Sequence, residues 1–297
     1  DIGGSIRNPA HFCGVYGHKP TMGIVPLQGH LLPGGTAYKD ISVGGPLARS
    51  AGDLKLALDI LAGPTGDLEK AWQFQLPPSR KSKLSDFKVG VLMESPVCAQ
   101  DEQLTEQLLD TVAALEKAGV QTDYTADPGF DWHRYWEVYL LLLRATTSAS
   151  YTDEEFEFHR QSAAARKPDD TRYRAYLDRG ITIRHRDWWM LHDEREQMRL
   201  RWRAFFEHYD LLLCPVAASA AFVHDHLGER PDRTIDINGQ QELVVDQLFW
   251  AGLSSVAYLP STVVPAGLTR AGLPCGLQLI APYLACLLYT SPSPRDR

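Results

Sequence analysis

The 297-residue sequence lacks the patterns that mark several large classes of protein. It contains no uninterrupted apolar run of roughly 18 residues, the length that a transmembrane helix needs. Its net charge of −7 disfavours a nucleic-acid-binding surface. Its five cysteines include no C-x-x-C pair, so we expect neither a disulfide framework nor a thiolate metal site. These absences leave an ordinary globular protein, with 44% hydrophobic residues, as the expected class.

The scarcity of paired cysteines also bears on the compartment. A reducing cytoplasm is the expected location for a chain without disulfides. The sequence does not begin with methionine, so it gives no information on whether a signal peptide precedes Asp1.

The most informative segment that is present is D-I-G-G-S-I-R at residues 1–7. Glycine tolerates positive φ and lets another backbone or a ligand approach closely. Consecutive N–H groups in such a loop can form a concavity for an anion or an oxyanion. Ser5 follows directly, where a hydroxyl nucleophile would stand. On the residues alone, a polar turn and a phosphate cradle remain alternatives, although the P-loop, the dinucleotide fingerprint and the G-x-S-x-G elbow are all absent.

Longer blocks of sequence carry a family resemblance. Residues 1–21 (D-I-G-G-S-I-R-N-P-A-H-F-C-G-V-Y-G-H-K-P-T) resemble the second half of the amidase signature. The resemblance continues in G-P-L-A-R-S at 45–50 and D-L-K-L-A-L-D-I-L-A-G-P at 53–64. It returns in L-P-S-T-V-V-P-A-G at 259–267 and G-L-P-C-G-L-Q-L-I-A-P at 272–282. The chain therefore resembles the amidase signature family, whereas residues 77–203 are poorly diagnostic.

The resemblance implies hydrolysis of a carbon–nitrogen bond in a small-molecule amide through an acyl-enzyme, with no metal or other cofactor. It makes Ser5 the attacking serine. It assigns the oxyanion hole to the backbone N–H groups of Ile2, Gly3 and Gly4, together with that of Ser5. Asp1 and Arg7 are expected to pin the loop as an ion pair; substrate binding by Arg7 is the alternative.

The same resemblance implies two further catalytic groups, a lysine and a serine in a cis peptide, upstream of this loop. Neither lies in a chain that begins at Asp1. We therefore expect the polypeptide as given to be the inactive C-terminal portion of a longer amidase. The alternatives are an amidotransferase subunit of the same family, which acts on charged tRNA with partner subunits, and a non-catalytic remnant. A homodimer is possible.

The implied fold is an α/β/α sandwich with a mixed sheet and helices on both faces, truncated at the N-terminus. The expected division is an amidase domain at 1–284 and a non-native or disordered tail at 285–297, which ends in S-P-S-P-R-D-R. Patterns of apolar residues and caps predict helices and strands independently of the resemblance. These patterns predict helices at 51–62, 101–118 and 193–208 and strands at 87–93, 120–124 and 211–215, and the resemblance implies a further helix at 242–252.

Three further clusters allow more than one interpretation. Trp132, Tyr135, Trp136 and Tyr139 recur at helical spacing, which favours core packing over a substrate pocket. The segment Glu194-Arg195-Glu196 is typical of a solvated helix face. His224 and His226 could share one side of a strand, but no further ligands stand at suitable spacing. We interpret the last segment as a loop at the rim of the active site.

Overall fold

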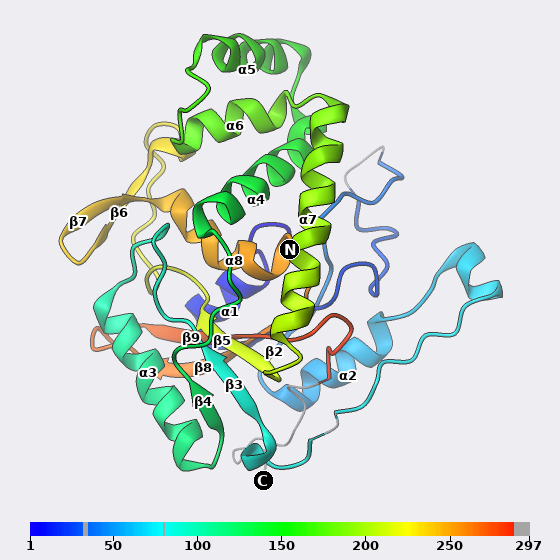
Figure 1. The fold of residues 1–297 in the computed structure, drawn as a ribbon, viewed down its shortest axis with the longest axis vertical. Coiled ribbons are helices and arrows are strands. Elements are labelled where there is room, and N and C mark those ends of the chain that lie inside the picture. The colour runs from blue at the N-terminus through cyan, green and yellow to red at the C-terminus, as the bar shows by residue number, and fades with distance from the viewer. Residues whose placement is uncertain (32–34, 80, 288–297) are drawn as a thin grey trace.

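The computed structural model describes residues 1–31, 35–79 and 81–287, and its centre is a seven-stranded mixed sheet (Figure 1). The strand order is β2-β1-β8-β9-β5-β3-β4. Strand β3 is parallel to β4 and β5, whereas the other neighbouring pairs are antiparallel. The strands are β1 (Tyr16–Lys19), β2 (Leu47–Ala48), β3 (Lys88–Val91), β4 (Gln121–Asp123), β5 (Leu211–Pro215), β8 (Ser261–Leu268) and β9 (Pro274–Ile280).

Helices cover both faces of this sheet, as the sequence predicts. Helices α4 to α8 are grouped above the sheet in Figure 1, and α3 lies beside β3 and β4. The helices are α1 (Arg7–Cys13), α2 (Ala51–Leu61), α3 (Glu102–Lys117), α4 (Trp132–Thr147), α5 (Asp153–Ala165), α6 (Tyr173–Ile181), α7 (His185–Phe205) and α8 (Leu248–Ser255). Short 3₁₀ turns are η1 (Gly66–Lys70), η2 (Leu84–Asp86), η3 (Ser148–Ser150), η4 (Arg230–Asp232) and η5 (Val244–Gln247).

Strand β5 shows how the sheet serves two cores. Successive side chains of a strand point to opposite faces. Leu211 and Leu213 accordingly pack with α3, while Leu212 and Cys214 pack with α4, α7 and α8. A strand whose residues are all buried is what a sheet covered on both faces requires.

Most of the predicted elements are confirmed within one to three residues at each end. Helix α2 begins after Ser50, whose hydroxyl accepts the Asp53 N–H at 3.1 Å. Helix α3 begins after Asp101, whose carboxylate accepts the Leu104 N–H at 2.8 Å. Strands β3 and β4 are parallel neighbours joined through α3, as the strand–helix–strand pattern predicts.

The predictions at 193–208 and 242–252 need correction. Helix α7 already begins at His185, eight residues before the predicted start, and Trp188 and Leu191 extend the apolar spacing of its later part back into this turn. Residues 240–243 form strand β7, which pairs with β6 (Thr234–Ile237) in a hairpin, and α8 begins only at Leu248. Asn238 and Gly239 both have positive φ, the conformation of a two-residue hairpin turn. The hairpin therefore replaces the first part of the predicted helix.

The prediction of a solvated Arg195 is also wrong. Its side chain is 1% exposed, and its Nη1 donates to Asp40 Oδ2 at 2.7 Å. The guanidinium also lies over the ring of Tyr258, 4.5 Å from the centroid. Arg195 therefore joins α7 to the loop that carries Asp40.

The C-terminal segment is described only as far as Leu287. Cys286 is buried, and its Sγ lies 3.4 Å from Thr21 Oγ1. Residues 285–287 thus pack against the domain, although the sequence assigns them to the tail. The remainder of the predicted tail, 288–297, lies outside the described residues.

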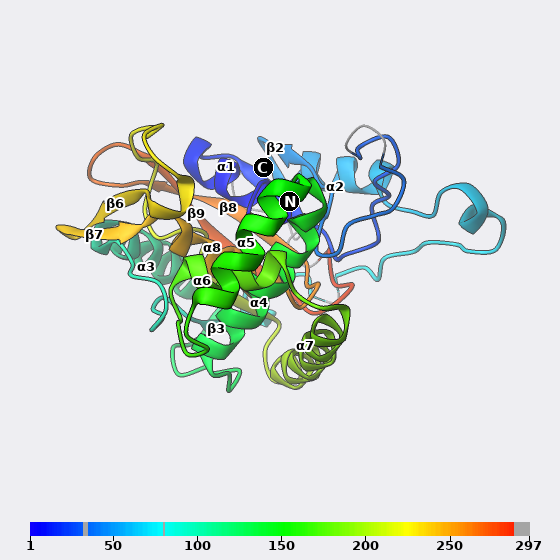
Figure 2. The ribbon, with the colours of Figure 1, turned by 90° about the horizontal axis from the view of Figure 1, so that it is seen from above.

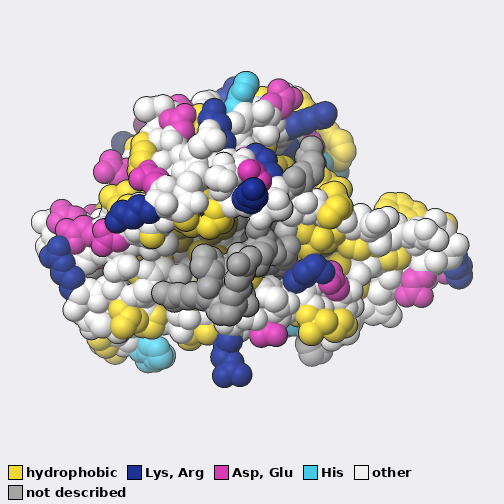
Figure 3. All heavy atoms as spheres, turned by 90° about the horizontal axis from the view of Figure 1, so that it is seen from below, with side chains coloured by type: hydrophobic (Ala, Val, Ile, Leu, Met, Phe, Trp, Pro, Cys, Tyr) yellow, Lys and Arg dark blue, Asp and Glu magenta, His cyan; other side chains and the backbone are white. Residues whose placement is uncertain are grey.

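Residues 64–79 form an arm that projects from the end of α2, with η1 near its tip (Figures 1 and 2). Leu68 and Trp72 on this arm are 51% and 66% exposed. Seen from below, hydrophobic side chains lie along the arm and on the adjoining face (Figure 3). Across the described ranges, no helix has both the length and the apolar character needed to cross a bilayer.

Helix α5 is held to the rest of the molecule by one buried carboxylate. Asp178 of α6 is 3% exposed and accepts hydrogen bonds from two residues of α5 and from Arg166, which directly follows the helix. His159 Nδ1, Ser162 Oγ and Arg166 Nε lie 2.7, 2.6 and 2.7 Å from its oxygens. Burial alone would raise the pKa of Asp178, but these hydrogen bonds lower it overall. Since α5 has no buried residue of its own, this polar contact fixes its position.

We predict that Asp178→Ala releases α5 while the sheet stays folded. Removing a buried carboxylate from such a network costs about 3 kcal/mol, because its partners lose their acceptor. Amide hydrogen exchange in α5 should therefore accelerate strongly. The control is Asp187→Ala on α7, which removes an exposed ion pair with Arg184 and should leave α5 unchanged. Unaltered exchange of α5 in Asp178→Ala would contradict the assignment.

Candidate functional site

The loop of residues 1–6 enters helix α1 beside α8 and the 40–46 segment. The Asp1 nitrogen and carbonyl both bond to the Val43 backbone, at 2.5 and 2.8 Å. Ser5 is the exposed residue of the loop, and its hydroxyl makes no hydrogen bond with the described residues. Gly4 and Ile6, on either side of Ser5, are buried. The loop therefore presents the Ser5 hydroxyl to solvent between two buried residues.

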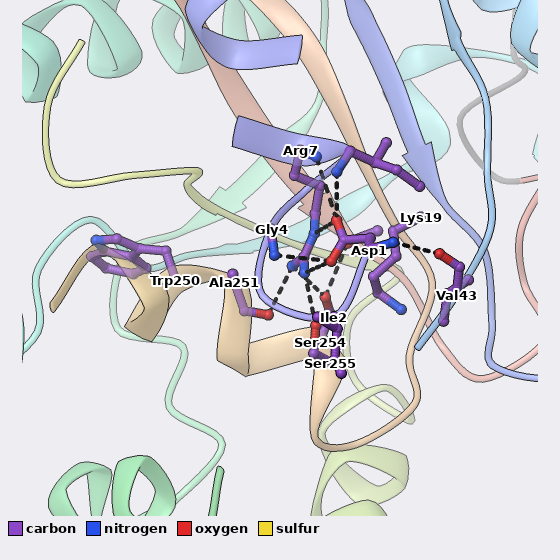
Figure 4. A network of polar contacts seen from close by, with 12 residues as sticks. Asp1, Ile2, Gly4, Arg7, Lys19, Val43, Trp250, Ala251, Ser254 and Ser255 are labelled. Carbon is purple, nitrogen blue, oxygen red and sulfur yellow. Dashed lines mark hydrogen bonds and ion pairs between the residues drawn. The ribbon is translucent and has the colours of Figure 1, made fainter. Parts of the chain in front are cut away.

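The Asp1 carboxylate organises this loop from within (Figure 4). Its Oδ1 accepts the Gly4 N–H at 3.0 Å, and its Oδ2 accepts the Ile6 N–H at 3.0 Å. The guanidinium of Arg7 donates to both oxygens, from Nη2 at 3.0 Å and from Nε at 3.1 Å. One carboxylate thus folds the backbone on both sides of Ser5 around itself.

Arg7 connects the loop to α8 and the sheet. Its side chain is fully buried, and burial lowers its pKa to about 10. Its Nη1 donates to the Ala251 carbonyl at 2.8 Å, and its Nη2 donates to Ser255 Oγ at 2.7 Å. The Nη1 group also contacts Ser254 Oγ and Gln278 Oε1, each at 2.9 Å. The planar fork of arginine can satisfy this many acceptors, which a lysine cannot.

Gln278 of β9 links the Arg7 guanidinium to β5 and α8. While its oxygen accepts from Arg7, its Nε2 donates to the carbonyls of Pro215 and Trp250, each at 3.1 Å. The side chain is fully buried. The acceptors around the Arg7 guanidinium are therefore held in place by buried residues of α8 and β9.

The two glycines are required for different reasons. Gly4 has a φ of +95°, and a Cβ there would lie 2.8 Å from Asn8 Oδ1. A Cβ on Gly3 would lie 3.1 Å from Leu248 Cδ2 of α8. The first glycine thus permits the turn, and the second lets the loop approach the helix.

The backbone donors of the loop differ in availability. The Gly4 N–H donates to Asp1, as described above. In the part of the chain that the structure covers, the N–H groups of Ile2, Gly3 and Ser5 have no acceptor. The Ile2 carbonyl is held instead by the Tyr139 hydroxyl of α4, at 3.2 Å. Three of the four expected oxyanion donors are therefore unused.

Basic side chains near the loop are engaged elsewhere. Lys19 is fully buried, and burial lowers its pKa well below the usual value. Its Nζ donates to the Pro20 carbonyl at 3.1 Å. The His11 ring is held between Ser219 and Gly276 of the backbone. Among the described residues, no basic group forms a hydrogen bond with Ser5.

The remaining sequence candidates do not assemble into a second centre. Of the aromatic stripe, Tyr135, Trp136 and Tyr139 are buried in the core, which confirms the packing interpretation. The rings of His224 and His226 lie 5.9 Å apart in an exposed segment. No group of three or more potential metal ligands exists within the described ranges.

Sequence reasoning missed the partners of Arg7. Ser254, Ser255 and Gln278 lie more than 240 positions from Arg7, so no local pattern connects them. The available signal was polarity in an apolar setting. Ser254 and Ser255 end the otherwise apolar segment L-F-W-A-G-L-S-S, and Gln278 interrupts the buried strand G-L-Q-L-I. Buried polar side chains in such positions need partners.

The chain matches known proteins over nearly its whole length. The family model described as Amidase matches residues 1–285. A glutamyl-tRNA(Gln) amidotransferase subunit from Chromobacterium violaceum is 28% identical over 96% of this chain and 60% of its own length. An acylamidase of Rhodococcus erythropolis is 28% identical over 95% of this chain and 56% of its own length.

The fold has a matching solved structure. A bacterial aryl acylamidase of the amidase signature family superposes with a TM-score of 0.73 at 22% identity, covering 99% of this chain and 60% of that one. The chain therefore spans about 60% of the length of the curated relatives and the solved structure that it matches.

We predict that Arg7→Met lowers the free energy of unfolding by about 3–5 kcal/mol, because it leaves the buried Asp1 carboxylate without a charge partner. Arg7→Lys should recover little of this loss, since an ammonium lacks the fork geometry. The control is Arg184→Met, which removes an exposed ion pair. Urea unfolding measures all three. Equal midpoints for Arg7→Met and Arg184→Met would show that the network does not stabilise the fold.

A second prediction separates backbone strain from crowding in the loop. Gly4 and Gly23 have similar φ values, +95° and +87°, but a Cβ on Gly23 meets nothing within 4 Å. Gly4→Ala should therefore destabilise the protein by about 1–3 kcal/mol more than Gly23→Ala, because only Gly4→Ala crowds Asn8. Thermal unfolding of the two variants tests this difference. Equal losses would mean that strain alone requires glycine at position 4.

Proposed function

The chain belongs to the amidase family, and we propose that Ser5 is the nucleophile that cleaves the carbon–nitrogen bond of a small amide. One observation carries this proposal. An exposed serine hydroxyl stands on a loop with unused backbone N–H groups, and a buried ion pair holds that loop. Exposure suits a group that must reach a substrate. Rigidity suits one that must hold its donors in place.

The proposed reaction has two halves. Ser5 Oγ attacks the amide carbonyl carbon and gives its proton to a base, and the carbonyl oxygen becomes an oxyanion. When the carbon–nitrogen bond breaks, the amine leaves with a proton and the acyl group stays on Ser5 as an ester. Water then hydrolyses that ester and regenerates the serine.

We assign the oxyanion to the N–H groups of Ile2, Gly3 and Ser5 rather than to that of Gly4. The Gly4 N–H already donates to Asp1 at 3.0 Å, so its use would break a contact that shapes the loop. Asp1 and Arg7 act as positioning residues that keep the other donors aligned. Each oxyanion donor contributes about 3–4 kcal/mol to transition-state stabilisation in comparable hydrolases.

The base is the part of the machinery that we do not assign within 1–297. A serine is a weak nucleophile without an adjacent base. Lys19 donates to the Pro20 carbonyl, and the His11 ring bonds to the Ser219 carbonyl and the Gly276 N–H. By family resemblance, a lysine and a second serine precede the loop in sequence. We therefore expect the 1–297 polypeptide alone to be inactive.

An amidotransferase subunit is the second candidate. The Chromobacterium protein supports it, because that subunit and the acylamidase are equally similar to this chain, each at 28% identity. Such a subunit would release ammonia from an amide by the same serine chemistry and pass it to a tRNA-bound substrate on partner subunits. Co-purification with those partners separates this candidate from a free-standing amidase.

The first measurement is the gene sequence on both sides of the segment that encodes 1–297. An upstream frame with a lysine and a G-S-S-G-G-S-like stretch would provide the protein to test. We expect that longer protein to release amine from small anilides and carboxamides. Ser5→Ala should lower its kcat by about 10⁴-fold or more.

Two comparisons complete this test. The 1–297 chain should show no hydrolysis above that of its own Ser5→Ala variant. A Ser162→Ala variant of the longer protein should keep its activity, since Ser162 lies on α5 and bonds to Asp178. An upstream frame without those residues, or a Ser5→Ala variant that keeps its activity, would refute the proposal.

A further inference from the structure

A cavity of about 740 Å³ lies between α4, α5, α6 and η4, away from the loop of residues 1–6. Its volume is within the range of small-molecule sites. Neither Ser5 nor any other loop residue lines it. The side chains that bear on its chemistry are Arg144, Tyr151, His159, Tyr173, Arg174 and Arg230.

Arg144 is a largely buried cation without a counter-charge. Its Nη2 donates to the Tyr173 hydroxyl, and its guanidinium carbon lies 5.3 Å from the centre of that ring. Within the described ranges, its Nε is buried without a hydrogen-bond partner, and no carboxylate lies within ion-pair distance. Burial lowers the pKa of Arg144, and the nearby charge of Arg230 lowers it further. A guanidinium in this state has unused donors.

Arg230 adds a second cation without an ion-pair partner to the lining of the cavity. It is exposed, begins η4, and forms no ion pair with the described carboxylates. Two arginines that line one cavity and repel each other are stabilised by an anion bound between them. A guanidinium presents two parallel N–H groups, the geometry that binds a carboxylate in a bidentate manner.

None of the other charged groups around the cavity forms an ion pair with Arg144 or Arg230 in the described structure. Arg174 forms an ion pair with Asp232, and His159 is bonded to Asp178. The Glu155 carboxylate accepts from the backbone and hydroxyl of Thr152 in a capping box. Glu154 and Glu229, which also line the cavity, are exposed to solvent.

We propose that this cavity binds an aromatic carboxylate, with its carboxylate between Arg144 and Arg230. Tyr151, Phe158 and Tyr173 supply the aromatic surface for the ring. Leu177 and Pro231 supply the remaining apolar wall. The proposal is independent of hydrolysis at Ser5, because the two sites share no residue.

Benzoate is the probe, and benzyl alcohol, which has a similar shape but no charge, is its neutral counterpart. Isothermal titration of the 1–297 chain should show benzoate binding and little or no binding of benzyl alcohol. Arg230→Gln and Arg144→Gln should each weaken benzoate binding by about tenfold, because each removes charge-assisted hydrogen bonds. Arg230 is exposed, so its substitution does not threaten the fold.

The matched control is Arg174→Gln. It removes a cation from the same wall, but one already paired with Asp232. Its affinity for benzoate should fall less than that of Arg144→Gln or Arg230→Gln, because the Arg174 donors are already taken by Asp232 and contribute no hydrogen bond to the ligand. Ser5→Ala should leave binding unchanged. Absence of benzoate binding, equal binding of benzyl alcohol, or an equal loss in Arg174→Gln would overturn the proposal.

Discussion

The buried ion pair between Asp1 and Arg7 is the interaction on which the candidate site depends. A charged pair out of water is stable only when the remaining donors and acceptors are satisfied. Here the carboxylate accepts hydrogen bonds from the N–H groups of Gly4 and Ile6, and the guanidinium donates to oxygens of α8 and β9. The loop around Ser5 therefore acquires its shape from groups that are far away in sequence.

The sequence predicted the parts of the fold that local chemistry determines. Helix α3 carries its cap at Asp101 and an apolar stripe, and β5 is a short apolar run, so both could be recognised alone. The β6–β7 hairpin was missed although Asn238-Gly239 is a strong turn signal, because the family resemblance implied a helix that begins at residue 242. Burial of Arg195 was unpredictable for another reason. Its partner Asp40 lies 155 residues away.

The candidate site could likewise be predicted from the sequence only in part. Residues 1–7 could be identified from their own pattern and from resemblance. The sequence could not show which of their N–H groups have an acceptor, because that depends on where the Asp1 carboxylate points. Only the three-dimensional arrangement separates Gly4, whose donor is used, from Ile2 and Gly3, whose donors are unused. Gln278 stands out in the sequence as a polar residue in a buried strand, but its partner could not be identified, because Arg7 lies 271 residues away.

Polar groups perform two different tasks in this protein. Around Asp1 and around Asp178, a buried carboxylate is fully satisfied and fixes one element against another. Around Arg144, a largely buried cation lacks its counter-charge and faces open volume instead. A hydrogen-bond network in which every group is paired holds one element against another. A network with unpaired groups is stabilised when a ligand pairs with them. On this reasoning the Asp1–Arg7 pair is a scaffold for Ser5, and the cavity beside Arg144 is a receptor in its own right.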